Sequence, residues 1–112
     1  MSYACVYMLA SGRNGTLYTG VTSNLETRIW QHKHDVLPGF SRKYGCRILV
    51  WFECHDDIHE AILREKRLKR WRRSWKLDLI EKDNPQWRDL YPQLLSVPAE
   101  SVLQDSPLLG PG

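Results

Sequence analysis

The chain has 112 residues and a formal net charge of +3 at pH 7. This length predicts one domain with a modest apolar core. No segment approaches the ~18 to 20 consecutive apolar residues of a membrane span, and the N-terminus lacks the charged-then-apolar pattern of a secretion signal. We therefore expect a soluble, cytoplasmic protein in which the cysteines are reduced and buried in strands: Cys5, Cys46 and Cys54.

The positive charge is confined to the first 95 residues. Residues 96–112 contain Glu100 and Asp105 and no Lys or Arg, so residues 1–95 carry a net charge of +5. The last segment is rich in Pro and has neither strand nor helix periodicity. We expect residues 1–95 to form the domain and residues 96–112 to be a disordered tail.

Two apolar-patterned runs open the chain and predict a β-hairpin. The first run covers residues 3–9 and the second covers residues 16–21, and the segment between them contains an Asn-Gly pair that favours a tight reversal. Pairing of the two strands would bring Tyr7 and Tyr18 into one neighbourhood of a sheet. Tyrosine is a favoured strand residue, so this proximity alone assigns no function.

The next elements are a helix and a strand. Ser23 and Glu26 resemble a capping box and predict a helix from about Leu25 to Asp35, with Val36 near its inner face and a stop at Pro38-Gly39. The continuous apolar run at residues 48–52 predicts a central strand that is covered on both faces.

Two helices follow. Asp57 opens the first, which we expect to end near Trp71, and the second covers residues 73–81 and stops before Asn84-Pro85. The predicted fold is therefore α/β: a small three-stranded antiparallel sheet flanked by helices, in the order strand-strand-helix-strand-helix-helix.

One carboxylate falls on an apolar helix stripe. Glu65 lies four residues after Ala61 and three before Leu68, so all three share one face of the predicted helix. Desolvating an unpaired carboxylate costs several kcal/mol. Glu65 is therefore either a structural ion-pair partner at the edge of the stripe or an inward ligand for a divalent metal.

Arg28 and His32 lie one helical turn apart, beside the inward positions Leu25 and Ile29. A guanidinium matches phosphate oxygens, and an imidazole can hold or transfer a proton near neutral pH. The alternative is an ordinary exposed helix surface.

A basic segment follows Glu65, with Trp71 and Trp75 interleaved. We expect the two tryptophans to anchor the core, while the density of cations favours a polyanionic partner. The candidate DNA-binding residues are Arg64, Lys66, Arg67, Lys69, Arg70, Arg72, Arg73 and Lys76.

The His and Cys residues give a weaker signal. His55 and His59 have helical metal-ligand spacing and Cys54 precedes them, which permits a structural zinc site, but no CxxC pair supports one.

Together these segments resemble one family. Cys5-Val6-Tyr7, ten intervening residues and Tyr18-Thr19-Gly20 are similar to the paired motif of the GIY-YIG nuclease superfamily, with Cys5 in place of the first glycine and Thr19 in place of isoleucine. The resemblance covers about residues 3–92 and points to the small stand-alone bacterial members. It rests further on residues at matching order and spacing: Asn14 to Leu17, Val21, Thr22, Arg28, His32, Arg64 to Lys66, Leu79, Ile80, Asn84 and Pro85.

The resemblance implies a metal-dependent DNA endonuclease. Tyr7 and Tyr18 would be active-site phenols; we favour Tyr7 as the base toward water, although the sequence does not decide between them. Arg28 would hold the scissile phosphate and His32 would assist proton positioning. Glu65 would bind a single Mg²⁺ or Mn²⁺, and Asn84 is a candidate for site support.

The resemblance also implies DNA as the partner, with single-stranded or branched DNA favoured over a specific duplex sequence, and a role in DNA repair or processing. One alternative is a nucleic-acid-binding module with little cleavage of its own that depends on a protein partner for targeting. Another is a protein-interaction adaptor whose basic helix contacts an acidic surface.

Overall fold

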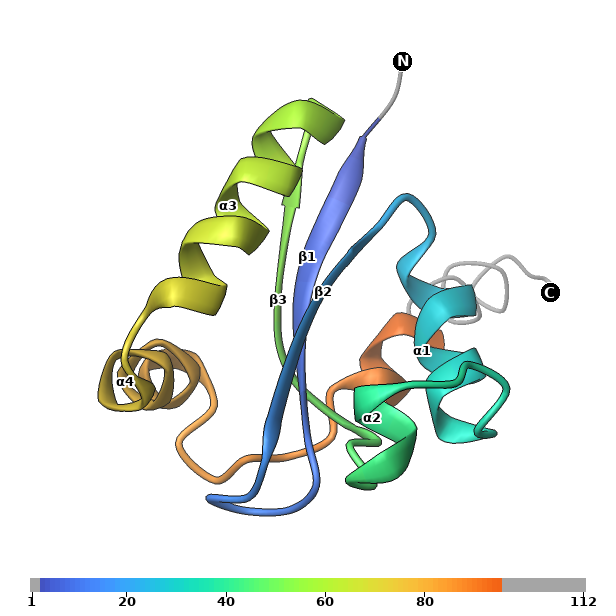
Figure 1. Cartoon of the computed structure of the whole chain (residues 1–112), viewed down its shortest axis with the longest axis vertical. Coiled ribbons are helices and arrows are strands. Elements are labelled where there is room, and N and C mark those ends of the chain that lie inside the picture. Colours follow the sequence, from blue (N-terminus) through green and yellow to red (C-terminus); the bar gives the residue numbers. More distant parts are fainter. Residues whose placement is uncertain (1–2, 96–112) are drawn as a thin grey trace, which may run out of the picture.

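A computed structural model of the chain describes residues 3–95 (Figure 1). The tail predicted at residues 96–112 lies outside this range. The three strands form one antiparallel sheet in the order β2-β1-β3, with helices on both faces. The predicted α/β class and the predicted element order are confirmed, with two additional short helical segments, one at residues 40–43 and one at residues 91–95.

The first two strands form the predicted hairpin. β1 (Ala4–Ala10) pairs with β2 (Leu17–Thr22). The connecting turn is closed by two backbone hydrogen bonds, from Ser11 N to Thr16 O at 3.0 Å and from Gly15 N to Gly12 O at 2.9 Å. Asn14 takes the left-handed conformation, with φ 58°, which an asparagine tolerates better than most residues.

The central strand is β1, and the expectation that residues 48–52 would be central is wrong. All seven residues of β1 are buried, whereas β3 (Ile48–His55) lies at the edge of the sheet. An apolar run fits this edge strand because a C-terminal segment covers both its side chains and its outer edge: Trp87 packs in the cluster on one face and Leu90 against the cluster on the other. Asp89 Oδ1 accepts from Leu49 N at 3.2 Å and Leu90 N donates to Leu49 O at 2.7 Å, so the backbone of Leu49 bonds to this segment on that side.

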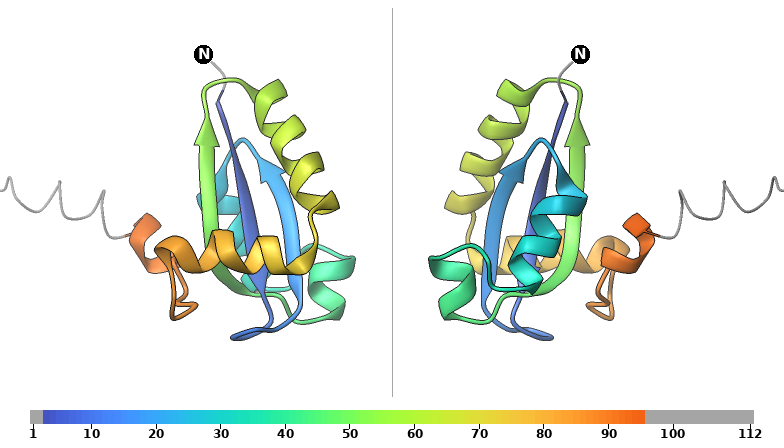
Figure 2. Two further views of the ribbon diagram at one scale, coloured as in Figure 1. Left: turned by 90° about the vertical axis from the view of Figure 1, so that its left-hand side faces the viewer. Right: turned by 90° about the vertical axis from the view of Figure 1, so that its right-hand side faces the viewer.

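The sheet separates two apolar clusters (Figures 1 and 2). On one face lie α3 (Ile58–Arg70) and α4 (Arg73–Asp83), and on the other lie α1 (Leu25–Lys33) and α2 (Phe40–Lys43). The strand alternation assigns β1 side chains to the faces. The α3/α4 side buries Ala4, Val6, Met8, Ala10, Ala61, Leu68 and Ile80, and the α1/α2 side buries Cys5, Tyr7, Leu9, Leu25, Ile29, Cys46 and Leu49.

The first helix differs from its prediction at both ends. Asn24, not Ser23, is the N-cap: its Oδ1 accepts from Thr27 N at 3.2 Å. The helix ends at Lys33 because Asp35 has a positive φ, and Val36 is consequently exposed. Asn24 directly follows Ser23 and can accept the same kind of capping hydrogen bond. The sequence pattern therefore located the start of the helix but not the residue that caps it.

The later helices follow the sequence closely. Asp57 caps α3 as predicted, accepting from His59 N at 2.9 Å, and α4 extends two residues beyond its predicted end at residue 81. The short α2 was not predicted. Of the two tryptophans predicted to anchor the core, Trp71 packs against it but Trp75 is exposed. No helix within residues 3–95 is long and apolar enough to cross a membrane.

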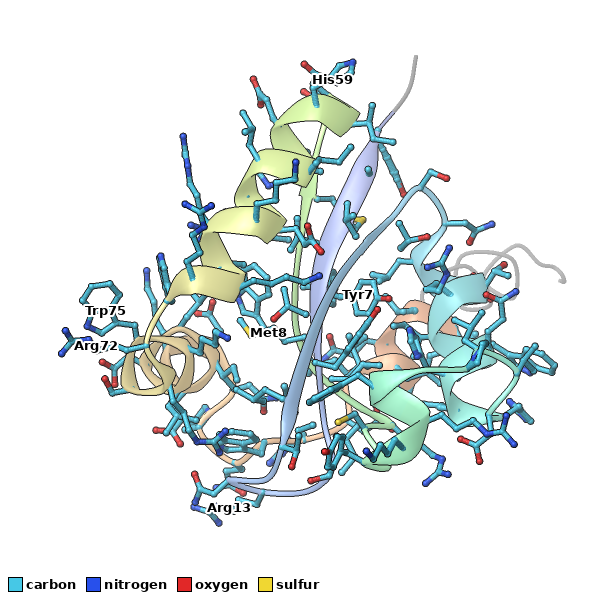
Figure 3. All side chains as sticks on the ribbon, in the orientation of Figure 1. Tyr7, Met8, Arg13, His59, Arg72 and Trp75 are labelled. Atoms are coloured by element: carbon cyan, nitrogen blue, oxygen red, sulfur yellow. A yellow bond between two sulfur atoms is a disulfide. The ribbon has the colours of Figure 1, made fainter. Side chains whose placement is uncertain are left out.

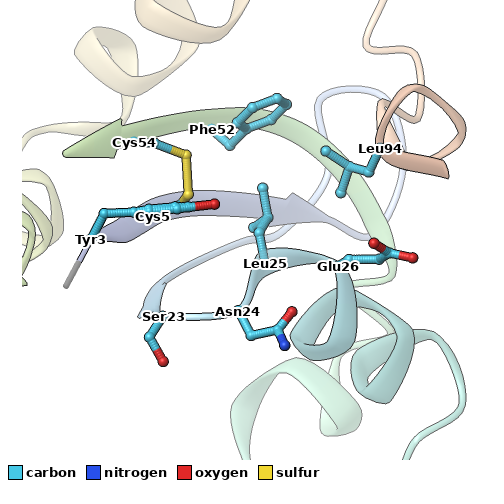
Figure 4. A pocket seen from close by; sticks show the side chains of 9 residues that line it. All are labelled: Tyr3, Cys5, Ser23, Asn24, Leu25, Glu26, Phe52, Cys54 and Leu94. Carbon is cyan, nitrogen blue, oxygen red and sulfur yellow. A yellow bond between two sulfur atoms is a disulfide. The ribbon is translucent and has the colours of Figure 1, made fainter. Parts of the chain in front are cut away.

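The cysteine prediction is also wrong in part. Cys5 on β1 and Cys54 on β3 occupy directly paired positions and are joined by a disulfide, while Cys46 is a free, buried thiol. The disulfide borders a cavity of about 500 Å³ between the sheet and the start of α1 (Figure 4). The antiparallel register brings the two sulfurs together, which two cysteines 49 residues apart in sequence did not indicate.

The disulfide predicts a redox-dependent stability. A cross-link over 49 residues restricts the unfolded chain, so Cys54→Ser should lower the free energy of unfolding by about 2–4 kcal/mol under non-reducing conditions. Urea denaturation of both proteins, with and without reductant, measures this difference. In reductant the wild type should approach the variant. An equal difference with and without reductant would show that the effect arises from packing instead.

Candidate active site

The two tyrosines project from the same face of the sheet. Tyr7 pairs with Gly20 and Tyr18 pairs with Leu9, so the phenols lie diagonally across the β1–β2 ladder. Their ring centroids are 6.2 Å apart. Figure 3 shows Tyr7 on the α1/α2 side of the sheet and Met8 on the α3/α4 side. The hairpin therefore brings the two phenols together, as the sequence predicted.

Gly20 provides the space that the Tyr7 ring occupies. A Cβ atom at position 20 would lie 2.5 Å from Tyr7 Oη and 2.6 Å from Tyr7 Cζ. Such contacts are far inside van der Waals distance, so any side chain at position 20 would displace the ring. The glycine of the second motif is therefore a steric requirement of Tyr7.

His32 contacts both tyrosines from the inner face of α1. Its Nε2 atom lies 2.9 Å from Tyr7 Oη, and its Nδ1 atom lies 2.9 Å from the Oγ atom of Ser41 on α2. The imidazole centroid is 5.7 Å from the Tyr7 ring and 5.3 Å from the Tyr18 ring. Ser41, His32 and Tyr7 thus form a buried hydrogen-bonded chain that fixes the rings relative to each other.

Burial and a nearby cation determine the protonation states of His32 and Tyr7 in this hydrogen-bonded chain. Burial lowers the pKa of His32 to about 4, and the charge of Arg28 lowers it further in the same direction, so the imidazole is neutral at pH 7. Burial and the adjacent Tyr18 raise the pKa of Tyr7 well above its usual range, while Arg28 opposes that rise. Tyr7 is therefore a neutral phenol in this structure.

Arg28 is a half-buried cation close to both groups. It lies in the first turns of α1 and its charge acts on the pKa of both Tyr7 and His32. Among residues 3–95, no carboxylate forms an ion pair with its guanidinium. An unpaired guanidinium beside buried aromatic rings is suited to bind an anionic ligand.

The two tyrosines differ in access to solvent. Tyr7 is 0% exposed, whereas Tyr18 is partly exposed and lines a cavity of about 290 Å³ at the unpaired edge of β2. Phe40 of α2, Lys69 of α3 and Lys76 of α4 line the same cavity. This cavity therefore touches both faces of the sheet around its open edge.

Glu65 occupies the inward position predicted on α3. Its side chain is 12% exposed, and its Oε2 atom lies 2.6 Å from the Nζ atom of Lys69. Glu65 belongs to α3, which covers the face of the sheet opposite to α1, whereas Tyr7 and Tyr18 belong to the α1/α2 face. Lys69 connects the two faces: it forms an ion pair with Glu65 and lines the 290 Å³ cavity that Tyr18 also lines.

The residues at this edge fit a hydrated magnesium ion better than a protein-coordinated one. Residues 3–95 contain no group of three or more His, Cys, Asp or Glu side chains placed to hold a metal. Mg²⁺ commonly uses one or two carboxylates, several waters and substrate phosphates. Glu65 offers one such carboxylate, provided that Lys69 releases it. The predicted zinc site of Cys54, His55 and His59 does not form within residues 3–95, because the sulfur of Cys54 is bonded in the disulfide.

The basic residues of α3 and α4 divide into two groups. Arg64 is held by Glu53 at 3.0 Å and lies over Trp71, and Arg73 donates to the backbone oxygens of Asn14 and Gly15. These two therefore brace the fold. Arg72 lies over the Trp75 ring, at the outer side of α4 (Figure 3). The second group comprises the exposed Lys66, Arg67, Lys69, Arg70 and Arg72 and the partly buried Lys76, while Arg73 is exposed as well as bonded to the hairpin turn.

The structure gives site roles to Ser41 and Phe40, which the sequence did not indicate, and a structural role to Asn84, whose role the sequence left open. Ser41 and Phe40 lie on the unpredicted helix α2, and a four-residue helix has no periodicity that could reveal it. Asn84 is buried, and its side chain bonds to Val50 O and to both backbone groups of Arg88. Its amide therefore secures the turn that covers β3.

Comparisons with known proteins agree with this geometry. The GIY-YIG catalytic domain family matches residues 3–78. A UPF0213 protein of Clostridium perfringens is 40% identical over 75 residues, covering 67% of this chain and 80% of that protein. A UPF0213 protein of Syntrophus aciditrophicus is 36% identical over 94 residues, covering 77% of this chain and 98% of that protein.

A solved structure extends the agreement to the fold. The solution NMR structure of a UPF0213 protein from Bacillus halodurans superposes with a TM-score of 0.50 at 25% identity, covering 78% of this chain and 92% of that chain. The fold of this chain, a small α/β domain with a three-stranded antiparallel sheet, is thus shared with that structure. The chain belongs to the GIY-YIG family, and small UPF0213 proteins are its homologues.

The low pKa of His32 predicts a loss of stability in mild acid. The unfolded imidazole takes up a proton near pH 6.5, whereas the folded one does so only near pH 4. Between these values the unfolded state binds more protons, so the free energy of unfolding should fall by about 3 kcal/mol as the pH drops through this window. Urea titrations from pH 7 to pH 4 should show this component vanish in His32→Gln and persist in His59→Gln, which changes an exposed histidine. Equal pH dependence in wild type and His32→Gln would contradict the assignment.

Gly20→Ala should disrupt the site through overpacking. The new methyl group has no room beside the buried Tyr7 ring, so the free energy of unfolding should fall by about 1–3 kcal/mol. Gly12→Ala is the matched control, because a Cβ atom there meets nothing within 4 Å and the change should stay within about 0.5 kcal/mol. Thermal unfolding compares the two. Equal stability of the two variants would refute the steric role of Gly20.

Proposed function

We propose that this protein is a metal-dependent endonuclease that hydrolyses DNA phosphodiester bonds, selects single-stranded or branched DNA, and acts in DNA repair or processing. The observation that carries the proposal is the Arg28 guanidinium, unpaired by any carboxylate of residues 3–95, beside the buried Tyr7–His32–Ser41 chain. Membership of the GIY-YIG family supports the same reaction class.

Arg28 would bind a non-bridging oxygen of the scissile phosphate. Its fixed charge in a partly desolvated setting favours the additional negative charge that develops in the transition state. A phosphate bound there would also offset the effect of Arg28 on His32, so the proton affinity of the imidazole would rise when substrate is present.

Burial argues for Tyr18 as the phenol that meets the attacking water. Tyr18 lines the open cavity, whereas Tyr7 has no exposed surface and its hydroxyl is engaged by His32. We therefore assign the water-contacting role to Tyr18, in place of the sequence-based preference for Tyr7. Tyr7 and His32 would hold Tyr18 and Arg28 in position.

Glu65 would hold the divalent ion. A bound Mg²⁺ or Mn²⁺ would supply positive charge to the phosphate and to the leaving 3′ oxygen. The carboxylate becomes available when Lys69 turns from Glu65 toward a DNA phosphate, an exchange that the mostly exposed Lys69 side chain permits. Water would attack phosphorus while its proton passes through the Tyr18 hydroxyl to solvent; the bond to the 3′ oxygen would break, and that oxygen would take a proton from solvent.

The basic residues support selection by DNA structure rather than by sequence. Lys69 and Lys76 line the cavity, and the other exposed cations of α3 and α4 offer further point charges to phosphates, which carry no sequence information. Targeting to a particular site would then come from the DNA structure or from a protein partner.

Substitution of the site residues tests the proposal. Purified protein is incubated with labelled single-stranded, duplex and branched DNA in Mg²⁺, Mn²⁺ or chelator. Tyr18→Phe and Glu65→Gln should each lower the cleavage rate by about 10²- to 10⁴-fold, because each removes a group that acts on the reacting atoms. Tyr3→Phe and Glu60→Gln, which change an exposed tyrosine and an exposed glutamate, should cleave at the wild-type rate.

The same assay separates the alternatives. Cleavage that persists in chelator, or in both site variants, would reject this site. Binding of every DNA without cleavage would identify the protein as a nucleic-acid-binding module.

A further inference from the structure

Two exposed aromatic rings continue the active-site face outward from Tyr18. The Tyr18 and Phe40 rings are nearly parallel, at an interplanar angle of 25° with centroids 6.3 Å apart, and the Tyr44 ring centroid lies 4.6 Å from that of Phe40 at an interplanar angle of 44°. Phe40 is 48% exposed and Tyr44 is 46% exposed. We call Phe40 and Tyr44 the aromatic shelf.

The shelf is formed by the first residue of a short helix and by the residue that caps its C-terminus. α2 covers four residues after Gly39, which has φ 113°, a backbone conformation that other residues rarely adopt. Ser41, the buried residue of α2, holds His32. This helix therefore fixes the imidazole of the site through Ser41 and presents Phe40 to solvent, and its C-cap residue presents Tyr44.

Positive charge surrounds these rings. Lys43 Nζ lies 5.4 Å from the Tyr44 ring centroid, and Lys69 and Lys76 line the cavity that Phe40 and Tyr18 also line. Burial, together with the charges of Arg73 and Lys69, lowers the pKa of Lys76. An anion in the cavity would relieve this crowding of cations. Flat apolar faces beside phosphate-sized positive sites match a nucleotide of a single strand.

We propose that the aromatic shelf binds an unpaired base of single-stranded DNA by stacking, while Lys69 and Lys76 bind the adjoining phosphate. That this base lies next to the bond that is cut rests on the proposed function. The binding of the base to the shelf does not depend on cleavage. A paired base is already stacked within its duplex and cannot present its face to Phe40 without leaving the helix. The shelf therefore supplies a preference for unpaired DNA at a site whose remaining contacts are to phosphate.

The test measures binding without cleavage. The full-length protein is titrated in chelator with a fluorescent single-stranded oligothymidylate. Phe40→Leu retains an apolar side chain but not the flat ring, and should weaken binding about tenfold, within the range measured for loss of one stacked base. Phe40→Trp should restore the affinity. Trp30→Leu is the matched control and should bind as the wild type, since Trp30 is 46% exposed but does not line this cavity.

Abasic DNA identifies the stacking partner. An oligonucleotide of the same length without bases should bind the wild type about tenfold more weakly, and Phe40→Leu should lose no further affinity on it. A tenfold loss in Phe40→Leu on abasic DNA as well would show that Phe40 acts on phosphate binding or folding, and would overturn the proposal. A different result would assign the shelf to a second copy of the chain: Phe40→Leu would bind DNA as tightly as the wild type, but in sedimentation it would no longer self-associate as the wild type does.

These outcomes are separable from failure of the nuclease proposal. Base-dependent binding that requires Phe40, in a protein that cuts no DNA, supports the shelf and rejects the endonuclease. Metal-dependent cleavage that requires Tyr18 and Glu65, with no effect of Phe40→Leu on affinity, supports the endonuclease and rejects the shelf.

Discussion

The close approach of the Tyr7 ring to the backbone of Gly20 is the constraint on which the candidate site depends. The ring lies across β2 because the paired residue has no Cβ atom, and this position brings its hydroxyl to His32. His32 in turn contacts Ser41, so α1 and α2 are fixed relative to the β-hairpin through one buried polar chain. Buried polar groups that are fully hydrogen-bonded give a core a single arrangement. Here that arrangement also orients Tyr18 toward the cavity.

One edge of the sheet is covered by a C-terminal segment and the other is open. Asp89, Leu90 and Asn84 bond to the backbone of β3 and close that edge. The outer edge of β2 has no neighbouring strand in the described part of the chain, and the cavity with Tyr18, Lys69 and Lys76 lies there. An uncovered edge exposes unpaired backbone groups. Positive charge along this edge discourages pairing with another strand and also suits a polyanionic ligand.

Sequence patterns predicted most of the elements, and failed where contacts remote in sequence decide the outcome. Strand alternation and the Asn-Gly turn gave the hairpin, and the stripe of Ala61 and Leu68 placed Glu65 inward on α3. The apolar run of β3 is typical of a central strand, but it lies at an edge that a loop from residues 84–90 covers. The Cys5–Cys54 bond depends on the register of β1 with β3, which no local pattern encodes.

The sequence by itself determined the chemistry that is present: two phenols at hairpin spacing, a guanidinium and an imidazole one turn apart, a carboxylate on an apolar stripe, and an excess of cations. Local periodicity reports which face a side chain occupies, because helix and strand repeats are fixed by backbone geometry. Only the tertiary structure decided that Tyr7 is sealed while Tyr18 is open, that α2 supplies Ser41 and Phe40, and that Glu65 meets the tyrosine face through Lys69 around the edge of β2. These are properties of packing between distant segments, and such packing leaves no periodic trace in the chain.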